Sequence, residues 1–300
     1  MQTYQNNTPP LFKCRCSAIG LIMTEPRGKS VADKIDDLII EIGKKKDRLK
    51  DAKPGLVSTA KLQASIIALE QQHDELVKDL GKPNLSETCK SYLKKWLFQE
   101  LSGKYVTFTS AQTEKGDKVE DEEITFLSTV IPEMPLAVKN TVYFENEYLT
   151  GTPDVLTLHA IIKAVYEYVF DAKASFDAGT FPAFEDELPE DGYDWQERGY
   201  MALTGAKKGA ILYALMSTPD EILERKAKYA LPEGYSREQY EEWAQNYKYD
   251  NLPAHLRVRR YDIEYSEEKE LAIYARIKEC RTYIEEVLWP MHLGNKQKYQ

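Results

Sequence analysis

The sequence has few cysteines, no long apolar run and no excess of positive charge. Its four cysteines are too few and too scattered for a disulfide framework, and the Cys14-x-Cys16 spacing does not match a zinc half-site. We therefore expect buried or surface thiols at Cys14, Cys16, Cys89 and Cys280. No stretch of about 18 apolar residues is present to span a membrane, and the polar first ten residues lack a secretory signal pattern. These absences predict a cytoplasmic protein.

The formal net charge of the chain is −9. This balance argues against a protein that coats nucleic acid by charge alone, although local basic patches can still meet phosphate. The two candidate patches are Lys44, Lys45, Lys46, Arg48, Lys50 and Lys53, and then Arg257, Arg259 and Arg260. Either patch can also be an ordinary solvated helix face or strand edge. The hydrophobic fraction of 42% is enough for a sizeable core in one large domain or two small ones.

Residues 30–80 show the clearest helical periodicity in the chain. Ser30 and Asp33 have the spacing of a capping box, and apolar residues then recur with helical spacing until Pro54-Gly55 interrupts the pattern. A heptad seam follows, formed by Leu62, Ile66, Leu69, His73, Leu76 and Leu80. The two segments predict an antiparallel helical hairpin, in which His73 is a packed core histidine rather than a ligand.

The rest of the chain alternates between helical and strand-like patterns. After a polar, unstructured start at 1–11, residues 12–24 predict a short strand or turn and a short helix with Ser17 as its N-cap. We expect further helices at 85–103, 110–130, 194–205, 219–229 (with Thr218 as N-cap), 236–247 and 267–288, strands at 141–150, 153–159, 164–173, 209–215 and 256–265, and an acidic loop at 176–192. The first three strands should be antiparallel neighbours, and a helical crossover should add the next. This order predicts an α/β (α+β) fold with a mixed sheet flanked by helices.

Two acidic residues and a lysine on neighbouring predicted strands form the first chemical pattern. Because side chains alternate along a strand, Asp171 and Lys173 share one face at the end of strand 164–173. If strand 153–159 pairs with it in antiparallel fashion, Asp154 lies across from Asp171. Two carboxylates at close range repel unless a divalent cation lies between them, and oxygen ligands favour Mg²⁺ or Mn²⁺ over zinc. The pattern therefore predicts a metal site.

The helices on either side of these strands add further candidates. In the preceding helix, Glu120 falls on the face of the apolar stripe, so we expect it to point inward toward a metal, with Glu123 as the substitute. In the following helix, Gln196 and Tyr200 lie four residues apart and share a face. Both can bind a phosphate or orient a catalytic group, although an ordinary amphipathic helix has the same spacing.

Taken in order, these motifs resemble the PD-(D/E)XK nuclease superfamily. The matching elements are Gly-Thr-Pro-Asp154, Asp171-Ala-Lys173 and Gln196-x-x-x-Tyr200, of which the last is typical of the RecB-like and phage-exonuclease branch. Lys115-Gly116-x-x-x-Glu120 resembles the helical glutamate motif of that branch. Arg15-Cys16-Ser17, followed by a short helix, is similar to the N-terminal Arg-x-Ser segment of phage recombination exonucleases of the lambda-exonuclease and YqaJ-like kind. The resemblance covers about residues 12–24 and 110–290.

The resemblance implies a restriction-endonuclease-like fold and metal-dependent hydrolysis of DNA phosphodiester bonds. The implied ligands of the Mg²⁺ or Mn²⁺ ion are Glu120, Asp154, Asp171 and the backbone carbonyl of Ala172. The implied catalytic set is completed by Lys173, which would orient or activate the attacking water, and by Gln196 and Tyr200. Arg15 and Ser17 would bind a DNA phosphate, assisted by the N-terminus of the short helix.

Two features depart from the family pattern. The second acid is often glutamate, whereas here it is Asp171. The predicted helical hairpin, at 30–82 between an N-terminal segment at 1–29 and a nuclease core at 83–300, is not a feature that the family resemblance implies; it can be a DNA arm, a subunit contact or an inhibitory element. Relatives with an iron–sulfur cluster carry a cysteine triplet near the C-terminus, where this chain has only Cys280, so we expect no cluster.

The implied function is a magnesium-dependent deoxyribonuclease that digests duplex DNA from its ends, in phage-type recombination or DNA processing. The sequence leaves open a structure-specific endonuclease of the same fold, and a non-catalytic DNA-binding or scaffold protein. The expected partners are linear duplex DNA, further copies of the chain and a single-strand annealing protein, with no membrane. If the protein is phage-encoded, its compartment is the bacterial host cytoplasm. Strand polarity and the choice between one metal and two are left open.

Overall fold

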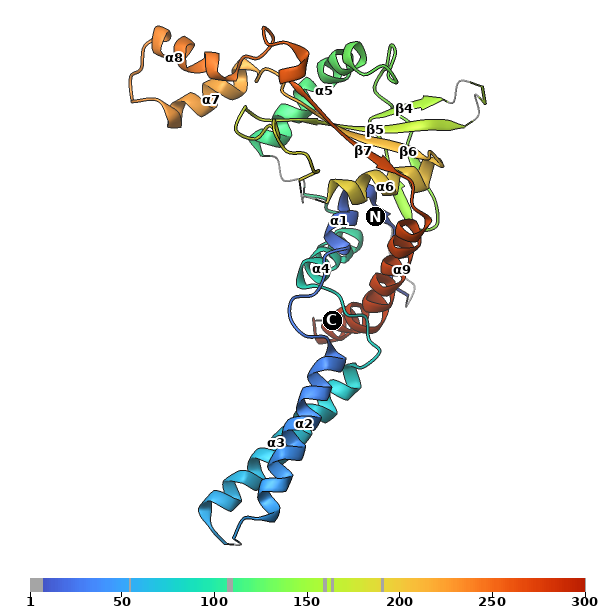
Figure 1. Ribbon diagram of the computed structural model, residues 1–300, viewed down its shortest axis with the longest axis vertical. Helices are drawn as coiled ribbons and strands as arrows, with labels where there is room; N and C mark the ends of the chain where they lie inside the picture. Colours follow the sequence, from blue (N-terminus) through green and yellow to red (C-terminus); the bar gives the residue numbers. More distant parts are fainter. Residues whose placement is uncertain are drawn as a thin grey trace. The chain divides into compact units, whose positions relative to one another are not determined.

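The structure is a computed structural model that describes residues 8–53, 55–106, 110–158, 161–162, 165–189 and 192–299 (Figure 1). Most of the chain falls into two compact units, the first comprising Leu11–Met23 and Gln99–Ile277, and the second containing Thr24–Phe98 and Lys278–Gln300. Within the described ranges, no helix is both long and apolar enough to cross a membrane. The prediction of an unstructured start falls, for residues 1–7, outside the described residues, as do Pro54 of the predicted turn and positions 159, 164 and 190–191 of the predicted strands and loop.

The first unit is built on a four-stranded mixed sheet with the order β4-β5-β6-β7. The strands are β4 (Val155–Leu158), β5 (Tyr166–Ala174), β6 (Lys208–Ala214) and β7 (Val258–Glu264). β4 and β7 pair antiparallel with their neighbours, whereas β5 and β6 are parallel. A parallel pair needs a crossover connection, and α6 (Tyr193–Thr204) lies in the connection between these two strands. The predicted mixed sheet and its helical crossover are therefore confirmed.

The two faces of this sheet carry separate hydrophobic cores. α5 (Ala111–Val130) covers one face, where its Val119 and Leu127 pack with Phe170 and Leu212. On the other face, Met201 of α6 packs with alternate residues of β6 and with residues of β7. The alternation of side chains along β6 produces both cores from one strand. The end of β5 is thereby held between two helices, and this end carries the polar residues of the site.

The segment predicted as a continuous strand at 141–150 forms two short strands instead. These are β2 (Phe144–Glu145) and β3 (Leu149–Gly151), and with β1 (Cys14–Arg15) they make a separate three-stranded sheet in the order β1-β3-β2. The Asn146 side chain accepts hydrogen bonds from the backbone N–H groups of Tyr148 and Leu149, at 2.8 Å each, and so turns the chain between β2 and β3. The prediction of three antiparallel neighbours in one sheet was wrong, because among the described residues β3 pairs with β1 and β2 and not with β4.

The N-terminal strand runs directly into two short helical turns, η1 (Cys16–Ala18) and α1 (Ile19–Ile22). The predicted strand and short helix are confirmed, but Ser17 lies inside η1 and no side chain caps either turn. A second predicted cap was also wrong: Pro219 precedes α7 (Asp220–Ala230), and the Thr218 hydroxyl instead donates to the carbonyl of Phe176 at 3.1 Å. α8 (Arg237–Ala244), η2 (Gln245–Tyr247) and η3 (Ala254–Leu256) lead on to β7.

The second unit contains the predicted helical hairpin, formed by α2 (Val31–Lys50) and α3 (Val57–Asp79). The capping box of Ser30 and Asp33 is present at its start. α4 (Glu87–Ser102) and α9 (Glu267–Tyr283) each run from one unit into the other, and α9 continues through a π-helical turn (Ile284–Leu288) into α10 (Trp289–Tyr299). All four cysteines are buried thiols, as predicted. The three-part division at 1–29, 30–82 and 83–300 remains a prediction.

Candidate active site

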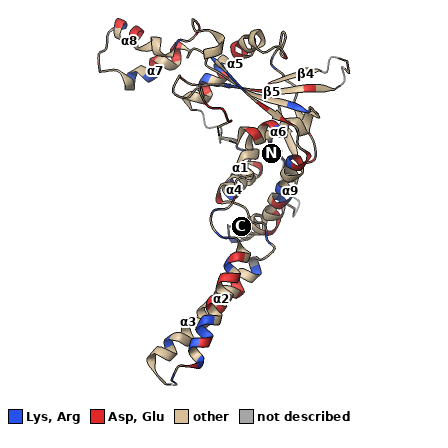
Figure 2. Cartoon of the chain, in the orientation of Figure 1, with Lys and Arg blue, Asp and Glu red and all other residues tan. Residues whose placement is uncertain are grey.

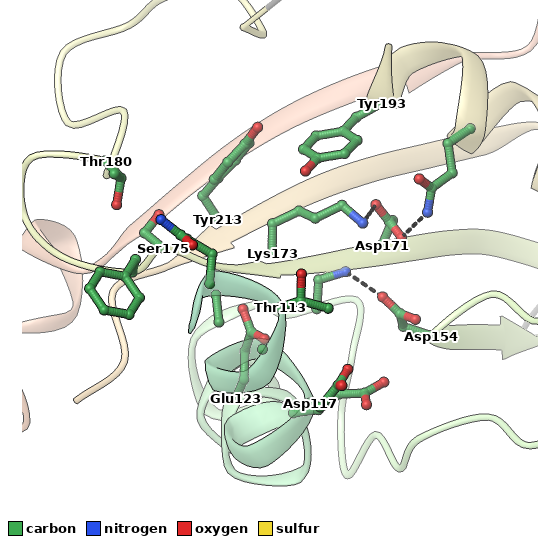
Figure 3. A pocket seen from close by; sticks show the side chains of 17 residues that line it. Thr113, Asp117, Glu123, Asp154, Asp171, Lys173, Ser175, Thr180, Tyr193 and Tyr213 are labelled. Atoms are coloured by element: carbon green, nitrogen blue, oxygen red, sulfur yellow. Dashed lines mark hydrogen bonds and ion pairs between the residues drawn. The ribbon is translucent and has the colours of Figure 1, made fainter. Parts of the chain in front are cut away.

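A cavity of about 460 Å³ opens beside β5, next to the beginning of the shorter strand β4 (Figure 3). Five carboxylate side chains from three segments line it: Asp117, Glu120 and Glu123 of α5, Asp154 before β4, and Asp171 of β5. Lys173, Tyr193 and Gln196 line it too. The cavity therefore collects acidic groups and one ammonium group at one edge of the sheet.

The pairing of β4 with β5 places Asp154 opposite Asp171. Val155 pairs with Phe170 in antiparallel register, so the next positions outward are these two aspartates. Oδ2 of Asp154 accepts a hydrogen bond from the backbone N–H of Ala172 at 2.8 Å. The backbone on the other side is fixed by Asn140, whose N–H donates to the carbonyl of Asp154 at 2.7 Å. The predicted juxtaposition of the two aspartates is thus present, and each is held in place by its surroundings.

Asp171 and Lys173 lie on the same face of β5, and Lys173 reaches back to the aspartate (Figure 3). Lys173 Nζ lies 2.6 Å from Asp171 Oδ2 and 4.5 Å from the centre of the Tyr193 ring. Gln196 Nε2 on α6 donates to Asp171 Oδ1 at 2.8 Å and to the hydroxyl of Tyr200 at 3.3 Å. The Gln-x-x-x-Tyr pair therefore touches the acid-lysine pair.

The glutamate that points inward from α5 is Glu123, not Glu120. Glu123 is 2% exposed, and its Oε1 atom has no hydrogen-bond partner among the described residues. Glu120 lines the cavity at its edge, where its half-buried side chain forms an ion pair with Lys139. The expectation that Glu120 shares the buried stripe was wrong because the buried positions include Lys115, Val119 and Glu123, which rotates the inner face of the helix.

Burial makes the carboxyl groups of Asp154 and Glu123 weak acids. Burial, and then the nearby charge of Asp171, raise the pKa of Asp154 to about 7. Burial and the neighbouring Asp154 raise the pKa of Glu123 well above its usual range. Burial alone would lower the pKa of the Lys173 ammonium, but the charge of Asp171 and the hydrogen bond to it outweigh this effect and raise the pKa. The cavity thus holds one fixed positive charge and a surplus of acidic groups.

The oxygen donors that line the cavity are of the chemical type that a hard divalent cation binds. In the parts of the chain that the structure describes, no three His, Cys, Asp or Glu side chains stand close enough together to hold a metal ion, and Lys173 provides the positive charge beside Asp171. A cation in the cavity would give the unpartnered Oε1 atom of Glu123 a partner, and it would offset the burial and repulsion that raise the pKa of Asp154. Carboxylate and carbonyl oxygens are the ligands that Mg²⁺ and Mn²⁺ prefer.

Two buried polar residues near the site were not assigned from sequence. Lys115 of α5 is fully buried, and its ammonium donates to the carbonyls of Ser175, at 2.7 Å, and of Phe176 and Met216. It thereby ties α5 to the ends of β5 and β6. Burial lowers the pKa of Lys115 to about 8. The only sequence signal was its place in the Lys-Gly-x-x-x-Glu motif.

The second unassigned residue is Glu197, on the buried side of α6. It is fully buried, and a Cβ atom on Gly209 of β6 would lie only 2.5 Å from its Oε1 atom, so glycine leaves the room for this carboxyl group. Burial and the charge of Asp171 raise the pKa of Glu197 well above its usual range, which favours the neutral acid. No pattern in the sequence distinguishes it from an ordinary solvent-facing glutamate.

Arg15 and Ser17 are exposed and do not line the cavity. Between them, Cys16 is buried, and its side chain lies where a Cβ atom on Gly151 or Gly199 would touch it. The N-terminal segment is therefore packed against β3 and α6, with Arg15 and Ser17 on its outer side. The basic residues at 257–260 are engaged within the fold instead: Arg257 is 5% exposed, and Arg260 contacts Glu133 and Asp262.

Comparison with solved structures finds the same fold in exonucleases. A phage related exonuclease from Haemophilus somnus 129PT superposes with a TM-score of 0.61 at 21% sequence identity, covering 94% of this chain and 97% of that one. An alkaline exonuclease from Laribacter hongkongensis superposes with a TM-score of 0.50 at 11% identity, covering 97% of this chain and 96% of that one. No protein-family model and no curated protein matches the sequence. The predicted fold is confirmed, over nearly the whole chain.

Proposed function

We propose that the protein is a metal-dependent DNA exonuclease of the RecB-like and phage-recombination branch of the PD-(D/E)XK superfamily. The observation that carries the proposal is the cavity at the end of β5, where Asp154, Asp171 and Glu123 meet Lys173. The acid, acid and lysine residues of the sequence motif line this one cavity, which supports the proposal. A scaffold protein without catalysis has little use for several buried carboxyl groups around one ammonium, because burying them is costly.

Each side chain has a proposed task that follows from its contacts. Asp154 and Asp171, with Glu123 or Glu120 and the carbonyl of Ala172, would hold a Mg²⁺ or Mn²⁺ ion. Bound there, the ion would lower the pKa of a water molecule and neutralise charge on the scissile phosphate.

The remaining groups compensate charge or orient another side chain. Lys173 carries its positive charge at the mouth of the cavity, where it would stabilise the oxygens of the phosphate as negative charge grows on them. Gln196 fixes the orientation of Asp171 through its 2.8 Å hydrogen bond, and Tyr200 in turn contacts Gln196. We assign Gln196 as a positioning residue, because its amide acts through the aspartate.

The substrate we propose is linear duplex DNA, digested from its ends. Arg15 and Ser17 are exposed on a segment that packs against β3 and α6, and an arginine there can bind a terminal phosphate through two N–H groups. The structural resemblance to a protein described as a phage related exonuclease supports a role in phage-type recombination. Such a role would place the protein in a bacterial cytoplasm beside a single-strand annealing protein.

The deciding experiment compares nucleotide release from linear and covalently closed circular duplex DNA, with Mg²⁺ and with a chelator. We expect release from linear DNA only, and only with the metal. Asp171→Asn and Lys173→Ala should each lower the rate by about 100-fold or more, with a cooperative melt retained. Asp186→Asn, at a highly exposed aspartate, is the matched control and should leave the rate unchanged.

The alternatives predict different outcomes. Rapid cutting of closed circles would favour the structure-specific endonuclease. Metal-independent DNA binding without cleavage would favour a scaffold protein. Wild-type rates in Asp171→Asn would reject the site itself.

A further inference from the structure

The helical hairpin carries an exposed face that its own two helices do not cover. Lys46 of α2 and Glu70 of α3 form an ion pair at 2.7 Å, so these two residues lie on the same side of the hairpin. Ile39 lies seven residues before Lys46, and Val77 lies seven residues after Glu70, so both fall on that face. Ile67, three residues before Glu70, joins them. We call this surface the Lys46–Glu70 face.

The Lys46–Glu70 face has an apolar centre that is open to solvent. Ile39 is 53% exposed, Ile67 is 55% exposed and Val77 is 42% exposed. The hairpin buries few apolar side chains of its own, with Ile35, Leu38 and Ile66 as its buried aliphatic residues. Aliphatic side chains spaced along one helix face in this way are typical of a surface that packs on another helix.

Charge along the same face changes sign from one end of the hairpin to the other. Asp36 of α2 and Asp74 of α3 lie at the end away from the turn, whereas Lys46 and Lys50 lie toward the turn. In Figure 2, the acidic residues of α2 lie mostly toward one end of the helix and the basic residues mostly toward the other. A surface of this kind is complementary to itself when a second copy is turned end for end.

Gly43 gives a second and independent observation at the centre of the face. It lies in the middle of α2, four residues after Ile39 and three before Lys46. A glycine inside a helix costs stability, yet a Cβ atom at Gly43 would meet nothing within 4 Å. The hairpin itself therefore has no steric need for glycine there. A glycine would be required at this position if the backbone of another helix approached it closely.

We propose that the Lys46–Glu70 face binds the same face of a second copy of this chain, forming an antiparallel four-helix bundle about a two-fold axis near Gly43. The axis brings Asp36 and Asp74 of one copy opposite Lys46 and Lys50 of the other, and it joins the two apolar centres. A helix pair about 30 Å long and about 20 Å wide presents roughly 600 Å² per copy. Two such faces bury about 1,200 Å², at the lower limit of specific interfaces, so the dimer should be sensitive to salt.

The test measures the oligomeric state of the full-length protein by sedimentation velocity over a range of concentrations, at low and high NaCl. The wild type should contain a dimer at low salt that dissociates at high salt. Gly43→Gln should shift the protein toward monomer by at least tenfold in Kd, although glutamine is the better helix former and raises the melting temperature of the hairpin. A merely structural role for Gly43 predicts the higher melting temperature without the dissociation, and that result would overturn the proposal.

Charge reversal provides a second test that does not depend on glycine. Lys46→Glu with Lys50→Glu, and separately Asp36→Lys with Asp74→Lys, should each give monomers, and an equimolar mixture of the two variants should form a heterodimer. Failure of the mixture to associate would overturn the proposal. A wild type that stays monomeric would also overturn it. A third contrary result would be that the Lys46→Glu and Lys50→Glu variant binds a short duplex DNA more weakly while its oligomeric state is unchanged. That result would assign the basic end of the hairpin to nucleic acid binding. None of these outcomes depends on nuclease activity.

Discussion

Gln196 Nε2 on α6 lies 2.8 Å from Oδ1 of Asp171 on β5, and this contact joins the crossover helix to the acid at the strand end. Asp171 is 1% exposed and also carries Lys173 on its other oxygen. Its carboxylate is therefore oriented from two sides before any ligand arrives. The same hydrogen bond explains why a glutamine on α6 and an aspartate on β5 act as one unit.

Removing this hydrogen bond should weaken metal binding more than it weakens the fold. Gln196→Leu leaves Asp171 free to rotate, so we expect the Mg²⁺ concentration for half-maximal activity to rise by about 10- to 100-fold. Tyr200→Phe is the matched control: it removes only the longer 3.3 Å contact to Gln196 and should change this concentration by less than about threefold. Equal effects of the two variants would contradict the positioning role.

The two glutamates of α5 should differ in their contribution to activity. Glu123 is buried with an unpartnered oxygen, whereas Glu120 is neutralised by Lys139 at the edge of the cavity. We expect Glu123→Gln to lower activity by about 100-fold and Glu120→Gln by tenfold or less. In the metal-free protein Glu123→Gln should also raise the melting temperature, because it removes a buried acid. The reverse order of activities would restore Glu120 as the ligand.

The stability of the metal-free protein should depend on pH through Asp154. Its pKa is about 7 in the folded protein because of burial and the nearby Asp171, against 3.8 for an ordinary aspartate. Between these two values the folded state holds more protons than the unfolded state, so the free energy of unfolding should fall as the pH rises from about 4 to about 7. Asp154→Asn should flatten this slope in denaturant titrations at stepped pH, and Asp186→Asn should not.

Addition of Mg²⁺ should oppose this loss of stability. The ion binds the deprotonated carboxyl groups, so its stabilising effect should grow over the same pH range. At a Mg²⁺ concentration of about 100 times Kd, the stabilisation should reach about 2.7 kcal/mol. A Mg²⁺ effect that is constant from pH 4 to 7 would show that Asp154 is not a ligand.

Lys115 should contribute to stability rather than to chemistry. Lys115→Met removes the donor to three backbone carbonyls and leaves them buried, so we expect a loss of about 2 to 4 kcal/mol in the free energy of unfolding, measured with urea. Lys118→Met is the control on the same helix, because that lysine is partly exposed and forms an ion pair with Glu221 at the surface. A change of less than about 0.5 kcal/mol is expected there. Similar losses in both variants would contradict the anchoring role.

Arg15 should matter for the chemistry of the DNA end. It is exposed, and within the described residues no hydrogen bond or ion pair holds its side chain, so its guanidinium is available to a phosphate. We expect the wild type to degrade 5′-phosphorylated duplexes faster than 5′-hydroxyl duplexes. Arg15→Ala should lower the first rate about tenfold and leave the second nearly unchanged. Equal wild-type rates on both ends would reject a phosphate pocket at this position.

Strand alternation was the reliable guide to the site. It placed Asp171 and Lys173 on one face, and antiparallel pairing placed Asp154 opposite, because both follow from the period of two that any strand must have. The helix was harder to orient, since Glu120 and Glu123 both flank the apolar stripe. The rotation of α5 is set by Lys115, whose side chain binds backbone carbonyls on other segments. The periodicity of the helix sequence alone cannot predict these contacts.

The fold was predictable where elements were long and regular. The hairpin, α5 and the parallel pair β5–β6 lay where periodicity placed them. The small sheet was not, because strands of two or three residues are too short to show a period, and a side chain such as Asn146 decides where they turn. Glu197 is hidden for a related reason: its burial depends on the missing side chain of Gly209, far away in the sequence.

The parallel pairing of β1 with β3 has a consequence for the order in which the chain folds as it is synthesised. Cys14 finds its partner Leu149 only after the whole hairpin and two further helices have left the ribosome. α2 and α3 make mainly local contacts and can pair as soon as they emerge. At a synthesis rate of about 5 to 20 residues per second, the N-terminal strand waits for several seconds with its buried positions Phe12, Cys14 and Cys16 still uncovered. A nascent chain stalled before β3 should therefore already have a folded hairpin, while its first strand is still open to chaperones and proteases.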